Sequence, residues 1–149
     1  MKTLFALLFI FLFTSNVVAG ENKNEVEIHI GSYHTNPIYN NFNYGIGYNY
    51  LFNSYFELNS GYYKNSEDGE SLYFGGTCNL YNSKKFVFGV GGILATGYKG
   101  LDIAPLVALV VKYKVVDSIA IKMAFTSSRY VYEPKVATEL FHFSITKSF

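Results

Sequence analysis

Every second residue is apolar in the segment Phe42-Asn43-Tyr44-Gly45-Ile46-Gly47-Tyr48-Asn49-Tyr50-Leu51-Phe52. A period of two indicates a β-strand, because successive side chains of a strand point to opposite faces. One face of this strand is aromatic or aliphatic, and the other carries mainly glycine and asparagine. A greasy outer face and a narrow polar inner face are typical of a strand in a transmembrane β-barrel.

The same alternation recurs along the chain from residue 26 onward. It predicts eight strands, at residues 26–33, 42–52, 56–65, 71–80, 85–96, 103–113, 118–126 and 136–149. Segments of about 8–12 residues match the length that a tilted strand needs to cross a bilayer. Only a closed barrel satisfies every backbone group in lipid. We therefore predict an all-β fold, an eight-stranded antiparallel transmembrane barrel of outer-membrane type.

The predicted connections alternate in length. Three are short, at residues 53–54, 81–84 and 114–117, and four are longer, at residues 34–41, 65–70, 97–102 and 127–135. In outer-membrane barrels the short turns face the periplasm and the long loops face the exterior. This assignment places both chain ends in the periplasm, which an even number of strands requires.

The composition agrees with a membrane protein. Half of the 149 residues are hydrophobic, 15% are charged, and 28 are Tyr or Phe, which is more apolar and more aromatic than a typical soluble domain. The formal net charge is +1 without a basic run, so nucleic acid is not an expected partner. Cys78 is the single cysteine, and no Cys/His cluster has zinc-site spacing, so we expect neither a disulfide nor a metal or other cofactor.

The two ends of the chain indicate export. Lys2, a ten-residue apolar run and the small residues before position 20 predict a signal peptide at residues 1–19, with the barrel at residues 20–149. The apolar run is about half the length of a spanning helix. Phe149 closes an alternating terminal strand and resembles the assembly signal of bacterial outer-membrane barrels. The predicted location is the bacterial outer membrane, and the predicted state is a monomer.

Three polar residues are predicted to meet at the outer rim. His34 follows the first strand, and Asn65 and Ser66 follow the third, so the topology brings them to the same end of the barrel. A histidine that takes a proton from a serine, with a carboxamide orienting the imidazole, is the arrangement of many acyl-transfer sites. Such residues are also common in surface loops, and this alternative stays open.

The predicted lumen contains further polar residues. His29 and His142 are expected to be hydrogen-bonded interior residues. Glu27, Glu57 and Lys122 are candidates for a buried ion network, since charges in a lumen must be paired. An eight-stranded interior holds side chains or one slender ligand, so a general diffusion pore is not expected.

In order along the chain, these features resemble the PagP-type lipid A palmitoyltransferases, which are eight-stranded outer-membrane acyltransferases. The resemblance consists of Tyr33-His34, Gly45 with Gly47, Tyr62-Tyr63-Lys64-Asn65-Ser66, Gly75-Gly76, a glycine-rich segment at residues 89–97, and Ile103-Ala104-Pro105-Leu106-Val107. It implies the transfer of an acyl chain from a phospholipid to the lipid A of lipopolysaccharide.

The resemblance also implies roles for individual residues. The catalytic His, Asp and Ser of the family correspond to His34, Asn65 and Ser66, and Asn65 departs from the pattern because the carboxylate is missing. Prolines of the family leave gaps in strand pairing through which lipid passes, and Pro105 and Pro37 are the corresponding candidates.

A charged residue of the last outer loop is a further candidate for lipid contact. Arg129 is the single arginine, and a guanidinium can bind a lipid phosphate through paired hydrogen bonds. The alternative is a solvated loop charge.

Two other functions stay open beside acyl transfer. A noncatalytic outer-membrane barrel with a structural or surface-interaction role is favoured by Asn65, so whether the chain is an enzyme is undecided. A lipid A deacylase is the third reading, because His142 and Ser144 share one face of the last strand at His-x-Ser spacing.

Overall fold

The computed structural model describes residues 24–127 and 138–149. Eight strands make up the fold: β1 (Asn24–His34), β2 (Gly45–Leu51), β3 (Phe56–Lys64), β4 (Glu70–Asn82), β5 (Phe86–Ala95), β6 (Ala104–Val116), β7 (Ile119–Ser127) and β8 (Glu139–Ser148). The predicted signal peptide and Arg129 lie outside the described residues. No helix in the described part of the chain is long and apolar enough to cross a membrane.

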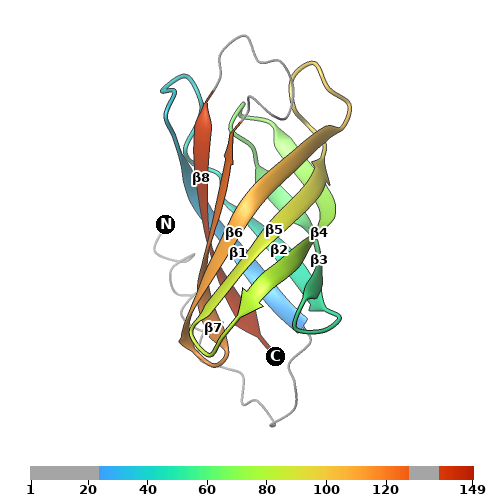
Figure 1. The fold of residues 1–149 in the computed structure, drawn as a ribbon. Helices are drawn as coiled ribbons and strands as arrows, with labels where there is room; N and C mark the ends of the chain where they lie inside the picture. Colours follow the sequence, from blue (N-terminus) through green and yellow to red (C-terminus); the bar gives the residue numbers. More distant parts are fainter. Residues whose placement is uncertain (1–23, 128–137) are drawn as a thin grey trace, which may run out of the picture.

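The strands form one closed antiparallel barrel in sequence order (Figure 1). Each strand pairs with its neighbour along the chain, and β1 closes the barrel by pairing with β8 from Glu25↔Ser148 to His34↔Leu140. The predicted eight-stranded barrel is therefore confirmed. Closure pairs the first strand with the last, so the sheet has no edge strand, which is the condition for a sheet to exist in lipid.

The two ends of the barrel differ as the sequence predicts. The described connections at one end are residues 52–55, 83–85 and 117–118, and those at the other are residues 35–44, 65–69 and 96–103, together with the end of β7 and the start of β8. Both the start of β1 and the end of β8 lie at the end with the short turns (Figure 1). By the length rule this is the periplasmic end, and the longer loops are external.

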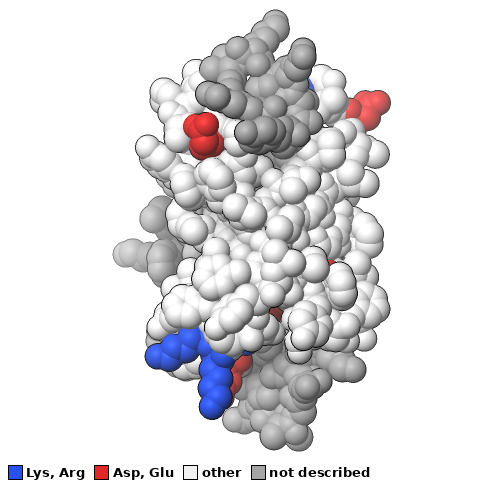
Figure 2. Space-filling view, in the orientation of Figure 1, with Lys and Arg blue, Asp and Glu red and all other residues white. Residues whose placement is uncertain are grey.

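The side wall of the barrel is apolar. Exposed outward residues are aromatic or aliphatic on every strand, for example Ile46, Phe74, Leu94, Leu109 and Ile121. Figure 2 shows that charged side chains are concentrated near the two ends and almost absent between them. An apolar belt of this kind is the surface that a hydrocarbon environment requires.

Some predicted strand bounds are wrong by a few residues. β2 begins at Gly45 rather than at Phe42, because residues 42–44 are held by isolated backbone bonds at the rim, such as Lys64 N–H to Tyr44 O at 2.9 Å. Phe42 and Tyr44 still point outward, so the apolar pattern extends beyond the ladder. β6 continues past Tyr113 to Val116, and β8 begins at Glu139, since Thr138 is outside the strand.

The lumen holds the predicted ion network with two additional members. Lys122 Nζ lies 2.8 Å from Glu27 Oε2, and Lys112 Nζ lies 2.7 Å from Glu57 Oε2 and 2.9 Å from Glu25 Oε2. All five side chains are buried. Pairing of this kind is what makes ionised groups tolerable in a closed interior.

Two glycines on the inner face of the barrel make room for the side chain of Tyr73. Gly47 and Gly61 face each other across β2 and β3. A Cβ atom at Gly47 would lie 2.2 Å from the hydroxyl of Tyr73, and one at Gly61 would lie 2.7 Å from the same ring. Gly47, predicted on the polar face of β2, and Gly61 of β3 thus accommodate a buried tyrosine of β4.

β1 contains a bulge that the alternation does not predict. Its register with β8 shifts between His29 and Gly31, so Ile30 is an extra residue in the ladder. The shift changes the inward set from odd to even positions. Glu25, Glu27 and His29 point inward before it, and Ser32 and His34 are turned toward the lumen after it.

Candidate functional site

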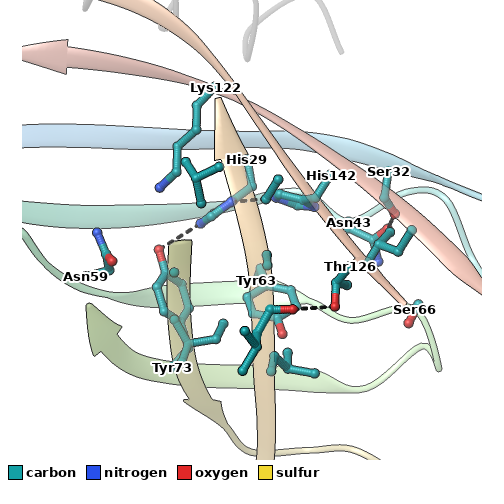
Figure 3. Close-up of a pocket in the computed structure, with 18 of the residues that line it drawn as sticks. His29, Ser32, Asn43, Asn59, Tyr63, Ser66, Tyr73, Lys122, Thr126 and His142 are labelled. Carbon is teal, nitrogen blue, oxygen red and sulfur yellow. Dashed lines mark hydrogen bonds between the residues drawn. The ribbon is translucent and has the colours of Figure 1, made fainter. Parts of the chain in front are cut away.

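The external half of the barrel contains a cavity of about 130 Å³. Side chains from several strands and from the 65–69 loop converge on it (Figure 3). His34 and Ser66 both line it, although they are far apart in sequence. The structure therefore brings together two of the three residues predicted to meet at the rim.

The wall of the cavity has a polar part and an apolar part. Ser32, His34 and Asn43 contribute polar groups from β1 and the residues before β2. β5, β6 and β7 contribute Gly91, Ile93, Leu106, Val107, Ala108, Val110 and Ala124 to an apolar part of the wall, and β7 also contributes the polar residues Lys122 and Thr126. The cavity is suited to a slender ligand that has an apolar chain and a polar end.

His34 is bound by an asparagine other than the predicted one. Its Nδ1 lies 2.8 Å from Asn41 Oδ1, which also accepts the His34 backbone N–H at 3.0 Å. The imidazole stacks on the Tyr39 ring with a centroid distance of 5.4 Å. With Nδ1–H donating to Asn41, Nε2 is the acceptor nitrogen of a neutral imidazole.

Asn65 has a structural role in the external loops. Its Nδ2 donates to Ser71 Oγ at 3.0 Å and to Gly97 O at 2.8 Å, and its Oδ1 accepts the N–H groups of Glu67 and Gly69, both at 2.9 Å. All four hydrogen-bonding positions of the amide are filled. In this geometry Asn41, rather than Asn65, binds the His34 imidazole.

The Ser66 loop is fastened to the loop that follows β1. Asn40 N–H donates to Ser66 O at 2.8 Å, and Asn40 Nδ2 donates to Asp68 Oδ1 at 2.7 Å. Hydrogen bonds from Lys64 and Asn40 hold the pKa of Asp68 below its usual value. Burial, with the negative charge of Glu67 nearby, raises the pKa of Tyr39. These contacts fix the mouth of the cavity.

The deep end of the cavity is formed by a histidine pair. His29 Nδ1 and His142 Nε2 lie 2.8 Å apart, and His29 Nε2 lies 3.0 Å from Tyr73 Oη (Figure 3). Both histidines are therefore hydrogen-bonded interior residues, as predicted. Ser144 Oγ donates to Glu27 Oε1 at 2.6 Å. His142 and Ser144 bond to different partners, so this geometry does not support the deacylase pair.

Strand pairing in the barrel wall is interrupted beside the cavity, between β6 and β7. Their ladder runs from Val116↔Ile119 to Leu109↔Phe125 and stops there, although Ala108 and Thr126 are both described strand residues. Beyond that point Thr126 Oγ1 donates to Val107 O. In Figure 1 the two strands diverge toward the external end. The cavity lining includes Val107, whose side chain is 59% exposed on the outward face.

The two prolines predicted to give lipid access occupy different positions. Pro105 lies in the part of β6 beyond the ladder with β7, where it pairs with Leu94 of β5. Pro37 lies in the 35–44 loop, beyond the last residue of β1, so it interrupts no strand pairing.

Several residues of the site were not singled out from the sequence. Tyr63 and Tyr73 are aromatic but lie on the inner faces of β3 and β4, and both are buried. Tyr63 Oη lies 2.8 Å from Tyr98 Oη of the next external loop. The sequence does contain a signal for Tyr63. The inward residues Asn59 and Gly61 of β3 have odd numbers, and Tyr63 follows them at the same spacing of two. No group of three or more His, Cys, Asp or Glu in the described ranges is arranged to hold a metal ion.

Comparison with known proteins identifies the fold. No family model and no curated protein matches the chain. A de novo designed transmembrane β-barrel matches with a TM-score of 0.65 and 16% identity, covering 89% of this chain and 100% of its own. The N-terminal β-barrel domain of Pseudomonas aeruginosa OprF matches with a TM-score of 0.57 and 14% identity, covering 88% of this chain and 100% of its own.

The chain is a small outer-membrane-type β-barrel. The likeness concerns the fold, and the apolar belt, polar lumen and paired chain ends agree with it. A closed barrel with this surface belongs in the outer membrane of a bacterial cell. The resemblance to the palmitoyltransferases stays a prediction.

Proposed function

We propose that this barrel binds the acyl chain of a membrane lipid in its external half and admits it sideways between β6 and β7. The observation that carries the proposal is the cavity that reaches from the lumen to Val107, beside the point where the β6–β7 ladder stops. A chain moving along this path crosses few strand-to-strand hydrogen bonds. Pro105, which has no N–H to donate, lies next to the same path.

The chemistry of the walls supports the same ligand. Methylene groups of a lipid fit the β5–β6 side, where Ile93, Leu106 and Ala108 line the cavity. Burial of each CH₂ contributes about 0.8 kcal/mol. The ester region of the lipid then lies near the polar rim, where His34 and Ser66 line the cavity.

Photo-crosslinking tests acyl-chain binding directly. The full-length protein is folded into vesicles that contain a phospholipid with a diazirine at the end of one acyl chain, and labelled peptides are mapped by mass spectrometry. We expect label on inward residues such as Ile93 and Ala108. Ala108→Phe fills the cavity and removes that label, whereas the matched control Val90→Phe changes an outward residue of β5 and leaves it. Label confined to outward residues would overturn the proposal.

A second candidate function is acyl transfer to lipid A. It is favoured by the presence of His34 and Ser66 on one cavity. In this reaction His34 accepts the hydroxyl proton as Ser66 attacks the phospholipid ester, which releases a lysophospholipid that takes up a proton. A lipid A hydroxyl then accepts the acyl group from Ser66 and gives up its own proton.

Lipid A analysis separates transfer from binding alone. Cells that express the protein are expected to contain lipid A heavier by one acyl group, and His34→Ala and Ser66→Ala each abolish the shift. If lipid A is unchanged while inward crosslinking persists, the barrel binds lipid without catalysis. That outcome corresponds to the noncatalytic alternative, in which the only role of Asn65 is to hold the external loops by hydrogen bonds.

A further inference from the structure

Lysine side chains cluster on one side of the periplasmic rim. Lys84 and Lys85 are exposed in and beside the turn between β4 and β5. Lys114, near the end of β6, reaches the same turn, because its Nζ donates to Asn82 Oδ1 and to Ser83 O, both at 3.1 Å. Lys114 N–H also donates to Lys85 O at 2.8 Å. Figure 2 shows lysine or arginine side chains extending from this end of the barrel.

This lysine cluster has few acidic neighbours. Within the described part of the chain, none of the three lysines forms an ion pair. Asp117, in the turn between β6 and β7, is the nearest acidic residue in sequence. The external loops and strand ends are instead rich in acids and contain Glu67, Asp68, Glu70, Asp102 and Glu139 beside Lys64 and Lys99. Among the described residues, the barrel is therefore basic at one side of its periplasmic end and acidic at its external end.

An outward aromatic cluster lies next to the lysines. Tyr81, Phe86, Phe88 and Tyr113 are all exposed on the lipid face. The Phe86 ring centroid lies 5.1 Å from that of Tyr113 and 6.1 Å from that of Phe88, and Tyr81 lies 5.9 Å from Phe88. Aromatic side chains with a polar tip concentrate at the level of lipid headgroups. Lys85 directly precedes Phe86 and is exposed, so it lies at the periplasmic border of this cluster, where a lysine can extend its ammonium toward lipid phosphates.

We propose that this rim is a binding site for the phosphate of an anionic phospholipid in the periplasmic leaflet. The acyl chains lie along the Phe86–Tyr113 side of the barrel, and the ammonium groups of Lys84 and Lys85 bind the phosphate, while Lys114, on the inner face of β6 with Lys112, holds the turn that carries them. Charge complementarity selects the partner, since a lysine cluster attracts a lipid with net negative charge more strongly than a zwitterionic one. The site is remote from the external cavity and does not rest on the proposed function.

Native mass spectrometry of the full-length protein tests the site. The folded protein, released from detergent, is titrated with phosphatidylglycerol and separately with phosphatidylcholine, and the 1:1 lipid adducts are quantified. Near a membrane surface each lysine strengthens the attraction about fivefold. We therefore expect phosphatidylglycerol to be preferred, and the preference to fall about 25-fold in Lys84→Gln/Lys85→Gln.

The matched control removes two lysines at the other end of the barrel. Lys64→Gln/Lys99→Gln is expected to keep the preference of the parent. Added salt lowers the preference in the parent and in this control by the same factor, because it screens an exposed charge interaction. Equal binding of the two lipids by the parent overturns the proposal. So does an equal loss of preference in both double variants.

Discussion

Lys122 Nζ and Glu27 Oε2 lie 2.8 Å apart at the centre of the barrel, where both side chains are buried. Glu27 also accepts hydrogen bonds from Ser144 Oγ at 2.6 Å and Asn49 Nδ2 at 3.0 Å. The charge of this carboxylate is therefore balanced by one ammonium and supported by two neutral donors.

Removing one partner of this pair is expected to be costly. Lys122→Met leaves a buried carboxylate without its cation, and we expect a loss of about 3–5 kcal/mol in the free energy of unfolding. Urea titration in lipid vesicles measures the change. The exposed Lys99→Met control is expected to change stability by about 0.5 kcal/mol or less. Adding Glu27→Gln to Lys122→Met should recover part of the loss; no recovery would mean that charge is not the cause.

Gly47 is expected to tolerate no side chain while Tyr73 keeps its hydroxyl. A Cβ atom at Gly47 would lie 2.2 Å from that hydroxyl, which is held by His29. Gly47→Ala is therefore expected to destabilise the barrel by about 1–3 kcal/mol, the usual cost of overpacking. The effect should be smaller in a Tyr73→Phe background. Gly92→Ala is the control, because the nearest atom to its Cβ is 4.0 Å away.

Asn65→Asp is expected to loosen the external loops rather than to create a catalytic triad. An ionised carboxylate cannot donate to Ser71 Oγ and Gly97 O, which accept from Asn65 Nδ2. Tryptic cleavage after Lys99 should become faster in this variant, and lipid A should stay as in the parent. A gain of acyl transfer in Asn65→Asp would contradict the role assigned to this amide.

The contact between the Asp68 loop and the Asn40 loop should weaken in acid. The pKa of Asp68 is lowered in the folded protein by hydrogen bonds from Lys64 and Asn40. A lowered folded pKa means that the contact is fully present above the unfolded value, near 3.9, and is lost as pH falls through the folded pKa. Hydrogen exchange of the Asn40 N–H, which donates to Ser66 O, should accelerate over that range relative to an unprotected amide at the same pH.

Asp68→Asn is the matched control for this pH effect. Asp68 has a φ of 64°, and asparagine tolerates the left-handed region as well as aspartate does. The variant keeps the turn but has no titrating carboxylate, so its Asn40 N–H exchange should lack the additional acceleration in acid. An identical acid response in parent and variant would show that another group is responsible.

The sequence alone determined the barrel. The alternation in residues 42–52 specifies which face meets lipid, and the eight segments with short and long connections specify strand number, topology and orientation. These features are readable because side chains alternate along every strand and because only a closed sheet is stable in lipid. The alternation also placed Glu27, Glu57 and Lys122 in the lumen, where the structure pairs them.

Only the tertiary structure decided the site. The bulge at Ile30 turns His34 into the lumen. Contacts in the loops then pair His34 with Asn41, whereas Asn65 bonds to Gly97 of another external loop. The interruption of the β6–β7 ladder beyond Leu109 is likewise absent from the residue pattern. Periodicity records the face of a residue within one strand, whereas bulges, loop contacts and strand separation depend on the partners that closure brings from distant parts of the chain.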